Sequence, residues 1–334
     1  MHMERDFENI VIALAADQNY FDGLLVTAGS IARNASRFAH ILWVILDGGV
    51  KNEDIDFLER TIRKVHDKSL FRRVDFSDSA LKRAIRYKGS VMPYARLFLP
   101  QVLPEHEFVI YCDVDFLWKA DVAELWKLRN RDFVLQSTLD ECISVNGWRT
   151  EDEWAKQNGF SLDRSKYFCS GLCLFNLRKI RERHLDERFF EMLHKYPDVP
   201  LVDQTIMNLV VPKEEIGWLP LMWQRLVCEL TRKKVSLPIV LHYAGATPWK
   251  PVNAKLLSDI ILAWFHEYAL LCDVSLRESV SRVHSPAFAV FSRLVFLVAT
   301  SCRISLCFFK LALRLIGHEG YARFCFRAPE LIKT

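Results

Sequence analysis

The chain has 334 residues, 51% hydrophobic and 26% charged, which is ample for a packed globular core. Its net charge of only +4 gives no reason to expect a nucleic-acid partner. None of the nine cysteines lies in a C-x-x-C pair and several fall inside apolar runs, which predicts reduced thiols in the cytosol. The first eight residues are polar and predict no signal peptide, so we expect a cytoplasmic protein.

The first part of the chain alternates between apolar runs and segments of helical periodicity. Strands are predicted at Ile10–Ala16, His40–Leu46, Leu70–Phe76, Phe108–Cys112 and Phe133–Thr138, and helices at Gly23–Ala35, Asn52–His66, Val91–Leu103 and Asp121–Leu128. This alternation implies right-handed crossovers and an α/β fold with a mostly parallel central sheet flanked by helices. Neither G-x-G-x-x-G after the first strand nor G-x-x-x-x-G-K-[ST] occurs, which disfavours dinucleotide-binding and P-loop proteins.

The second part of the chain is less regular. Residues 141–165 are polar and predict a loop with a short helix over the ligand crevice. Further strands are predicted at Tyr167–Leu177 and Pro238–Ala244, and further helices at Arg178–Tyr196 and Asp203–Val211. Gly171 lies inside one of these strands, where glycine often marks the close approach of a ligand or of backbone.

Two acids follow the predicted strand Phe108–Cys112 directly. Because side chains alternate along a strand, Asp113 and Asp115 are expected on the same side. Placing two carboxylates against an apolar core costs roughly several kcal/mol, which a divalent cation such as Mg²⁺ or Mn²⁺ would offset while also holding substrate phosphates. The alternative is a solvated strand end with two ordinary acids.

Other polar residues are expected near this Asp-x-Asp motif, because ligands bind at the carboxyl ends of parallel strands. Asp17 and Asn19 follow the first strand and would contact a base and a ribose. Arg96 would contact a phosphate or carboxylate, unless it is a surface arginine. His242, at a late strand end, is either a third metal ligand or a packed histidine. Asp203 is expected simply to cap a helix.

Six short motifs together resemble a known family. They are Ala15–Tyr20, Tyr94–Leu97, Tyr111–Asp115, Tyr167–Gly171 with Asn176 and Leu177, Asp203 with Gln204, and His242–Gly245 with Pro248 and Trp249. They occur in the order found in glycosyltransferase family 8, which contains bacterial lipopolysaccharide galactosyl- and glucosyltransferases and glycogenin. The resemblance covers about residues 9–270.

The resemblance implies a GT-A type nucleotide-diphospho-sugar transferase fold in residues 1–275. It also implies transfer of galactose or glucose from UDP-galactose or UDP-glucose, with retained configuration, to a saccharide such as lipopolysaccharide or lipooligosaccharide core. The metal, Mn²⁺ with Mg²⁺ possible, would be held by Asp113, Asp115 and His242. Gln204 and Asp203 would lie at the reacting sugar. The donor-binding residues would be Ala15, Asp17, Asn19, Arg96, Asp113, Val114, Asp115, Asp140, Cys169, Ser170, Gly245 and Lys250.

Two positions depart from the family's pattern. Cys169 stands where the family usually has Asn. The family usually has a diphosphate-binding Lys just before its Pro-Trp pair. In this chain Thr247 precedes Pro248 and Trp249, and Lys250 follows them. These departures keep open a non-catalytic sugar-nucleotide or membrane-binding protein. A sugar nucleotidyltransferase is a further alternative, but it would be expected to have a basic, Gly-rich loop after the first strand.

The C-terminal segment 276–334 differs in charge. Residues 277–334 hold nine Lys and Arg against three Asp and Glu, so the remaining chain has a net charge of −2. Within residues 285–317 the longest uncharged stretch, Leu294–Cys302, is too short to span a bilayer, which needs about 20 residues. A helix from Ile304 would align Arg303, Lys310 and Arg314 and lie in an anionic membrane surface, beside a lipid-linked acceptor on the inner face of the cell membrane. The alternative is a helix packed on the catalytic domain.

Overall fold

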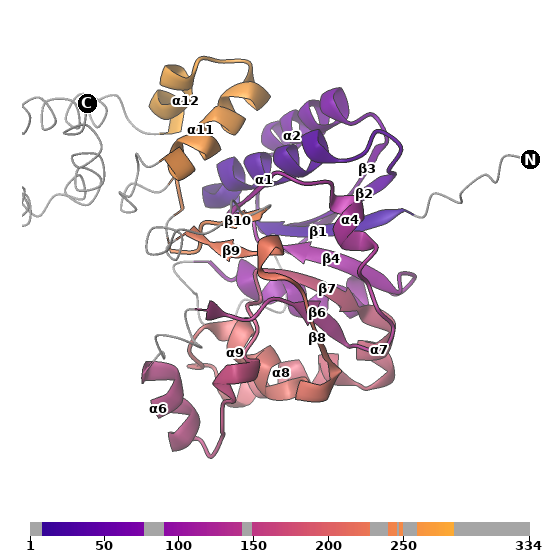
Figure 1. Ribbon diagram of the computed structural model, residues 1–334, viewed down its shortest axis with the longest axis vertical. Coiled ribbons are helices and arrows are strands. Elements are labelled where there is room, and N and C mark those ends of the chain that lie inside the picture. The colour runs from indigo at the N-terminus through magenta and orange to yellow at the C-terminus, as the bar shows by residue number, and fades with distance from the viewer. Residues whose placement is uncertain are drawn as a thin grey trace, which may run out of the picture.

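The structure is a computed structural model that describes residues 9–76, 90–141, 149–227, 240–245, 247–249 and 259–283. A seven-stranded sheet runs through this part of the chain in the order β3-β2-β1-β4-β7-β6-β8 (Figure 1). Its strands are β1 (Ile10–Ala16), β2 (Ile41–Asp47), β3 (Ser69–Asp75), β4 (Phe108–Cys112), β6 (Leu135–Ser137), β7 (Leu172–Asn176) and β8 (Ile216–Trp218). Only β7 is antiparallel to its neighbours, β4 and β6, so the sheet is mixed but mostly parallel, as predicted.

A second, three-stranded sheet adjoins the first at the carboxyl end of β4. It has the order β5-β10-β9, with β5 at Phe116–Trp118, β9 at Arg225–Leu226 and β10 at Val240–His242. The strand predicted at Pro238–Ala244 is β10, in which His242 pairs with Phe116 of the antiparallel β5. Because β5 begins directly after Asp115, this pairing places His242 beside the two acids.

Helices surround the main sheet. They are α1 (Phe21–Asn34), α2 (Asn52–Val65), α3 (Leu99–Val102), α4 (Val122–Trp126), α6 (Arg149–Gln157), α7 (Leu177–Glu182), α8 (Leu185–Lys195), α9 (Val202–Val210), α11 (Asp259–Cys272) and α12 (Leu276–Val283). Short 3₁₀ helices are η1 (Gln18–Tyr20), η3 (Met92–Phe98), η4 (Arg164–Lys166), η5 (Lys213–Glu215) and η6 (Leu221–Trp223). Figure 1 shows α1 and α2 on the side of β1, β2 and β3, and α7, α8 and α9 near β6 and β8. Helix α11 packs against α1, and α12 packs against α11.

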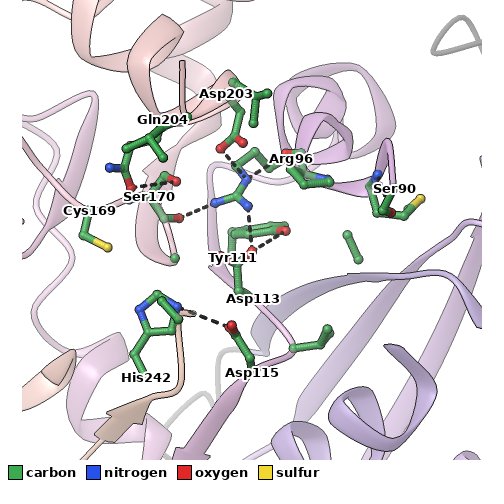
Figure 2. A pocket seen from close by; sticks show the side chains of 18 of the residues that line it. Ser90, Arg96, Tyr111, Asp113, Asp115, Cys169, Ser170, Asp203, Gln204 and His242 are labelled. Atoms are coloured by element: carbon green, nitrogen blue, oxygen red, sulfur yellow. Dashed lines mark hydrogen bonds and ion pairs between the residues drawn. The ribbon is translucent and has the colours of Figure 1, made fainter. Parts of the chain in front are cut away.

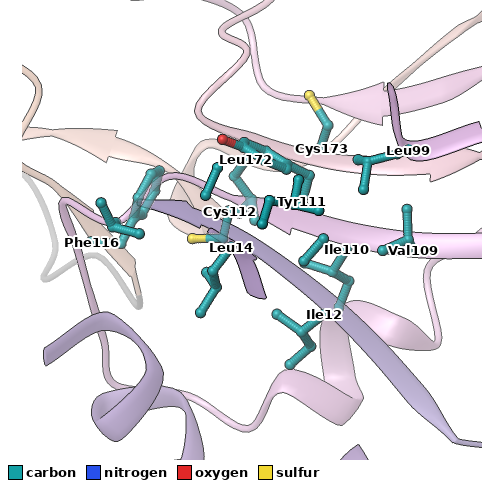
Figure 3. Close-up of a cluster of buried hydrophobic side chains, with 14 of the residues drawn as sticks. Ile12, Leu14, Leu99, Val109, Ile110, Tyr111, Cys112, Phe116, Leu172 and Cys173 are labelled. Carbon is teal, nitrogen blue, oxygen red and sulfur yellow. The ribbon is translucent and has the colours of Figure 1, made fainter. Parts of the chain in front are cut away.

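The core lies around β1 and β4. Every residue of both strands is buried, and Figure 3 shows Ile12 and Leu14 of β1 beside Ile110 and Cys112 of β4. Strands covered on both faces are expected to be continuous apolar runs, which is why the sequence identified these two so clearly. Their carboxyl ends point to the same edge of the sheet, where the polar motifs follow.

Several predicted elements need correction. The single helix Arg178–Tyr196 is wrong: α7 and α8 are separated at His184, whose left-handed φ of 52° breaks the helix. The helix predicted at Val91–Leu103 is the 3₁₀ helix η3 followed by the short α3, each with a proline in its first turn, Pro93 and Pro100. The strand predicted at Tyr167–Leu177 is shorter, because β7 begins only at Leu172.

Part of the C-terminal prediction lies beyond the described residues. The expected tail begins with α12, which packs against α11, and residues 284–334 lie outside the described ranges. Within those ranges, no helix combines the length and the apolar character needed to cross a membrane. The boundary predicted between residues 275 and 276 stays a prediction.

Candidate active site

A cavity of about 530 Å³ lies between the two sheets and α9. Figure 2 shows acids, an arginine and a histidine pointing into it from different segments of the chain. The predicted site residues that line it are Ala15, Arg96, Asp113, Val114, Asp115, Asp140, Cys169, Ser170, Asp203, Gln204, His242 and Gly245. The structure therefore brings together most of the residues that the sequence singled out.

The Asp-x-Asp motif forms the turn between β4 and β5. Because β4 ends at Cys112, both acids lie beyond the strand, and alternation along a strand is not what unites them. Backbone bonds hold the turn instead: Asp113 N–H donates to the carbonyl of Gly171 at 2.7 Å, and Tyr243 N–H donates to that of Asp115 at 2.8 Å. The turn is thus fixed between β7 and β10, with both carboxylates at the cavity.

Arg96 is the cationic centre of one side of the cavity. Its guanidinium pairs with Asp113 Oδ1 at 2.6 Å and with Asp203 Oδ2 at 3.0 Å. It also donates to the carbonyl of Ser170 and lies 4.2 Å from the ring centroid of Tyr111 (Figure 2). With a side chain only 2% exposed, Arg96 is not the surface arginine considered above.

Burial and charge shift the pKa values of this group in opposing ways. Burial raises the pKa of Asp203 to about 7, although Arg96 counteracts the shift. Burial, opposed by Arg96 and reinforced by Asp115, also raises the pKa of Asp113. Burial disfavours the charged form of Arg96, but the two carboxylates outweigh it and raise its pKa. One guanidinium therefore serves two buried acids, which leaves negative charge to be compensated.

His242 is held on every side. Its Nε2 lies 3.2 Å from Asp115 Oδ1, and its ring stacks on Phe116 with centroids 4.1 Å apart and an interplanar angle of 12°. A Cβ at Gly171 would lie 2.5 Å from Cε1 of His242, so only glycine fits there. The close approach predicted at Gly171 is made by this histidine. Burial lowers the pKa of His242, but Asp115 outweighs it and the net shift is upward.

Asp113, Asp115 and His242 fit a divalent cation. Each offers one ligand atom, and the three atoms lie within 4.8 Å of one another. Two carboxylates and an imidazole suit Mn²⁺, whereas Mg²⁺ prefers oxygen ligands throughout. A cation here would also offset the negative charge that burial makes costly.

Gln204 and Asp203 lie on the first turn of α9. The side-chain carbonyl of Gln204 accepts from Ser170 N–H at 2.9 Å, and its amide donates to Asp140 Oδ2 at 3.0 Å. The cap predicted at Asp203 is wrong: the residue before α9 is Leu201, and Asp203 reaches Arg96 instead. Leu201 and Val202 both have positive φ, 46° and 42°, which is strained for residues with branched side chains. That strained turn aims Asp203 and Gln204 into the cavity.

The remaining predicted donor-binding residues lie around this centre. Cys169 is buried and lines the cavity, and burial raises the pKa of its thiol well above the ordinary value. Asp17 does not line the cavity, but its Oδ2 accepts from the hydroxyl of Ser90, which does, at 2.6 Å. Asn19 is exposed, with its backbone N–H bonded to Asp17 Oδ1. Lys250 lies outside the described residues.

Sequence reasoning missed three residues that shape the site. The Tyr111 hydroxyl donates to Asp113 Oδ1 at 3.0 Å, and its position two residues before Asp113 was a signal that could have found it. Ser90 reaches the cavity from a segment with no recognisable motif. Gln224 lies 3.3 Å from Nδ1 of His242, a contact that the sequence did not suggest.

Comparison with known sequences agrees with this geometry. The model for Glycosyl transferase family 8 matches residues 11–252. A Haemophilus influenzae protein named for glycosyltransferase activity is 28% identical over 243 residues, which are 70% of this chain and 71% of that protein. General stress protein A of Bacillus subtilis is 24% identical over 216 residues, 63% of this chain and 71% of that protein.

Solved structures have the same fold. The galactosyltransferase LgtC, in complex with donor and acceptor sugar analogues, aligns with a TM-score of 0.64 at 21% identity, over 80% of this chain and 96% of LgtC. The apo bifunctional glycosyltransferase WbbM aligns with a TM-score of 0.67 at 21% identity, over 85% of this chain. The chain spans only 53% of WbbM, about half its length. These likenesses establish an α/β fold of GT-A type.

Proposed function

Because the chain belongs to glycosyltransferase family 8, we propose that it is a retaining hexosyltransferase that moves galactose or glucose from a UDP-sugar to a saccharide acceptor. The observation that carries the proposal is the convergence of Asp113, Asp115 and His242 within 4.8 Å at a cavity large enough for a sugar nucleotide. The acceptor that fits the predicted C-terminal tail is lipid-linked, such as a lipopolysaccharide core.

The chemistry requires charge stabilisation on the leaving group. Breaking the bond to the anomeric carbon leaves negative charge on UDP, and a bound Mn²⁺ supplies positive charge against it. The role of Asp113, Asp115 and His242 is to hold that cation. Arg96 pairs with Asp113 and Asp203 and lines the cavity, so it would orient those carboxylates beside the donor sugar.

The retained configuration follows from front-face attack. Gln204 is a poor nucleophile, because it is an amide and both ends of it are hydrogen-bonded, and Asp203 is paired with Arg96. The bond between the anomeric carbon and the phosphate oxygen breaks as a bond to the acceptor hydroxyl oxygen forms. The hydroxyl proton moves to the departing phosphate oxygen. A trapped glycosyl adduct on Gln204 or Asp203 would contradict this route.

The other donor contacts are assigned by position around the cavity. Ala15 near the end of β1 and Asp17 just after it lie where uridine would bind, with Asp17 acting beside Ser90. Asp140 and Ser170 flank Gln204 and would meet the donor sugar. The contacts of Asn19, Val114, Cys169, Gly245 and Lys250 with the donor remain predictions from the family resemblance.

The decisive experiment is a panel of UDP-sugars with Mn²⁺, comparing the wild type with Asp113→Asn. Release of UDP from UDP-galactose or UDP-glucose is expected in the wild type, with loss on chelation and in the variant. Binding of UDP-sugar without release, under any acceptor tested, would indicate the non-catalytic alternative. Formation of a UDP-sugar from UTP and a sugar phosphate would indicate the nucleotidyltransferase.

Attachment to the inner face of the cell membrane is the second part of the proposal. It depends on the basic and apolar pattern of residues 284–334. The full chain is expected to float with anionic liposomes, and a chain ending after Val283 is expected not to. Equal flotation of the two proteins would contradict the membrane role without affecting the proposed chemistry.

A further inference from the structure

Gln224 connects the candidate metal ligand His242 to the main sheet. It lies just before β9, is only 3% exposed, and contacts two partners with its carboxamide. Its Oε1 accepts from the backbone N–H of Leu172, the first residue of β7, at 3.1 Å. Its Nε2 lies 3.3 Å from Nδ1 of His242.

These contacts determine which way the carboxamide faces. A backbone N–H can only donate, so the carbonyl oxygen of Gln224 must be the end that faces Leu172. The NH₂ group then faces His242, whose Nδ1 must accept and therefore carries no proton. In the neutral ring the proton then lies on Nε2, which is 3.2 Å from Asp115 Oδ1.

The ring of His242 has little freedom to escape this arrangement. Phe116 stacks on one face of it, and the backbone of Gly171 lies so close to Cε1 that no Cβ would fit between them. A turn of the ring would also separate both nitrogens from their partners, Gln224 and Asp115. The protein therefore favours one tautomer of the neutral ring, with the amide of Gln224 at Nδ1 and the carboxylate of Asp115 near Nε2.

That tautomer is the wrong one for a cation held at Nε2. Metal ligation uses the Nε2 lone pair, so a neutral ring must carry its proton on Nδ1. An Nδ1–H would face the NH₂ group of Gln224, which brings two donors together. Turning the carboxamide does not remove the conflict, because its NH₂ group would then face the N–H of Leu172.

We propose that Gln224 is a positioning residue that keeps Nδ1 of His242 unprotonated and thereby lowers the affinity of the site for a divalent cation. The inference rests on the proposed function only in naming Asp113, Asp115 and His242 as the cation site. Groups that hydrogen-bond to metal-bound histidines usually accept from the ring N–H and strengthen binding. Here the partner donates, and the site is weaker than its three ligands alone would make it.

The first test is nitrogen NMR of metal-free, ¹⁵N-histidine-labelled full-length protein at alkaline pH, where imidazole rings are neutral. The His242→Gln variant identifies the signals of this ring among the ten histidines. An unprotonated Nδ1 and a protonated Nε2 are expected in the wild type. A protonated Nδ1 in the wild type would overturn the inference, and this readout needs no variant of Gln224 to fold.

The second test uses Gln224→Glu, whose carboxylate would accept from both Leu172 N–H and an Nδ1–H. Nδ1 is expected to become protonated, and Mn²⁺ to bind about 10- to 100-fold more tightly by calorimetry. Because the added charge alone would favour every divalent cation, Mg²⁺ is titrated as well, and it should gain less. An equal gain for Mg²⁺, or no gain for Mn²⁺, would overturn the inference.

Gln136→Glu is the matched control. Gln136 is also a buried glutamine, but its carboxamide bonds to backbone groups of Asn130 and Leu128 and not to a candidate metal ligand. This variant should leave Nδ1 of His242 unprotonated and the Mn²⁺ affinity unchanged, and a gain like that of Gln224→Glu would count against the inference. An unprotonated Nδ1 in a protein that releases no UDP would contradict the proposed function alone, and would support the role of Gln224.

Discussion

The cavity has two sides, and the buried carboxylates on each side are compensated by different partners. On the arginine side, defined by Arg96, Asp113 and Asp203, a buried guanidinium lies within hydrogen-bonding distance of both carboxylates. The histidine side is defined by Asp115, His242 and Gln224. There the imidazole lies between the carboxylate of Asp115 and the carboxamide of Gln224. The arginine side has a cation of the protein beside its two acids, whereas the histidine side, together with Asp113, offers ligand atoms to a metal cation. Stability should therefore depend mainly on the pairing of Arg96, and turnover on the three candidate cation ligands, Asp113, Asp115 and His242.

The largest effect is expected from Asp115→Asn on the histidine side. Losing a metal ligand should lower kcat/KM by about 100-fold or more, because stabilisation of the leaving diphosphate is lost. Mn²⁺ affinity should fall in parallel, while the free energy of unfolding should change little. Steady-state kinetics, calorimetry and denaturant unfolding measure the three quantities.

The control for this variant is Asp121→Asn, which makes the same change at the cap of α4. Asp121 accepts from Ala123 N–H at 2.9 Å, and Asn caps helices equally well. Its activity should match that of the wild type. Full activity in Asp115→Asn would remove the functional distinction between the two sides.

Arg96→Met should have the largest effect on stability. It leaves Asp113 and Asp203 without their cation, and breaking a buried pair by removing one partner costs about 3–5 kcal/mol. Arg72→Met is the matched control, because Arg72 pairs with Glu105 at the surface and such pairs are worth about 1 kcal/mol or less. Equal unfolding free energies for the two variants would show that the arginine side does not support the fold.

Asp203→Asn should change how stability depends on pH. The pKa of Asp203 is raised from 3.8 to about 7 in the folded protein, so the folded state binds more protons than the unfolded state between these values. The contribution of this group to the free energy of unfolding therefore falls progressively as pH rises from about 4 to about 7. The variant should lack this contribution, with Arg96 still paired to Asp113.

Denaturant unfolding of the wild type and Asp203→Asn at several pH values in this range provides the measurement. The difference between the two proteins should grow in favour of the variant as pH rises, and stay constant above pH 7 or so. A constant difference across the range would mean that Asp203 is ionised throughout. In that case Asp203 would be charged, and not protonated, over the whole pH range.

The smallest effect is expected from Cys169→Asn. The buried thiol of Cys169 lines the cavity and is a weak hydrogen-bonding group, whereas a carboxamide both donates and accepts. One added hydrogen bond to the donor should lower the KM for its UDP-sugar by about 10-fold. Cys169→Ala, which adds no such group, is the control. Equal KM values for the two variants would indicate that this position does not contact the donor.

Local sequence patterns were sufficient to predict the strands that are unbroken apolar runs. The apolar runs of β1 and β4 predicted buried strands because burial on both faces requires them. The single helix expected over Arg178–Tyr196 failed because the left-handed residue His184, which divides it, has no glycine or proline beside it to mark the break. The two- and three-residue strands β5, β8 and β9 were missed, because such short segments have no measurable periodicity.

The sequence by itself determined which side chains carry the chemistry: two acids after a buried strand, an arginine, a late histidine and the pair Asp203 and Gln204, in the order of one family. Tertiary structure alone decided how they are paired. Arg96 meets Asp203, and Gln224 links Leu172 to His242, across chain separations that no local pattern encodes. Hydrogen bonds and ion pairs depend on distance in space, and for these residues that distance is set by the packing of two sheets and α9.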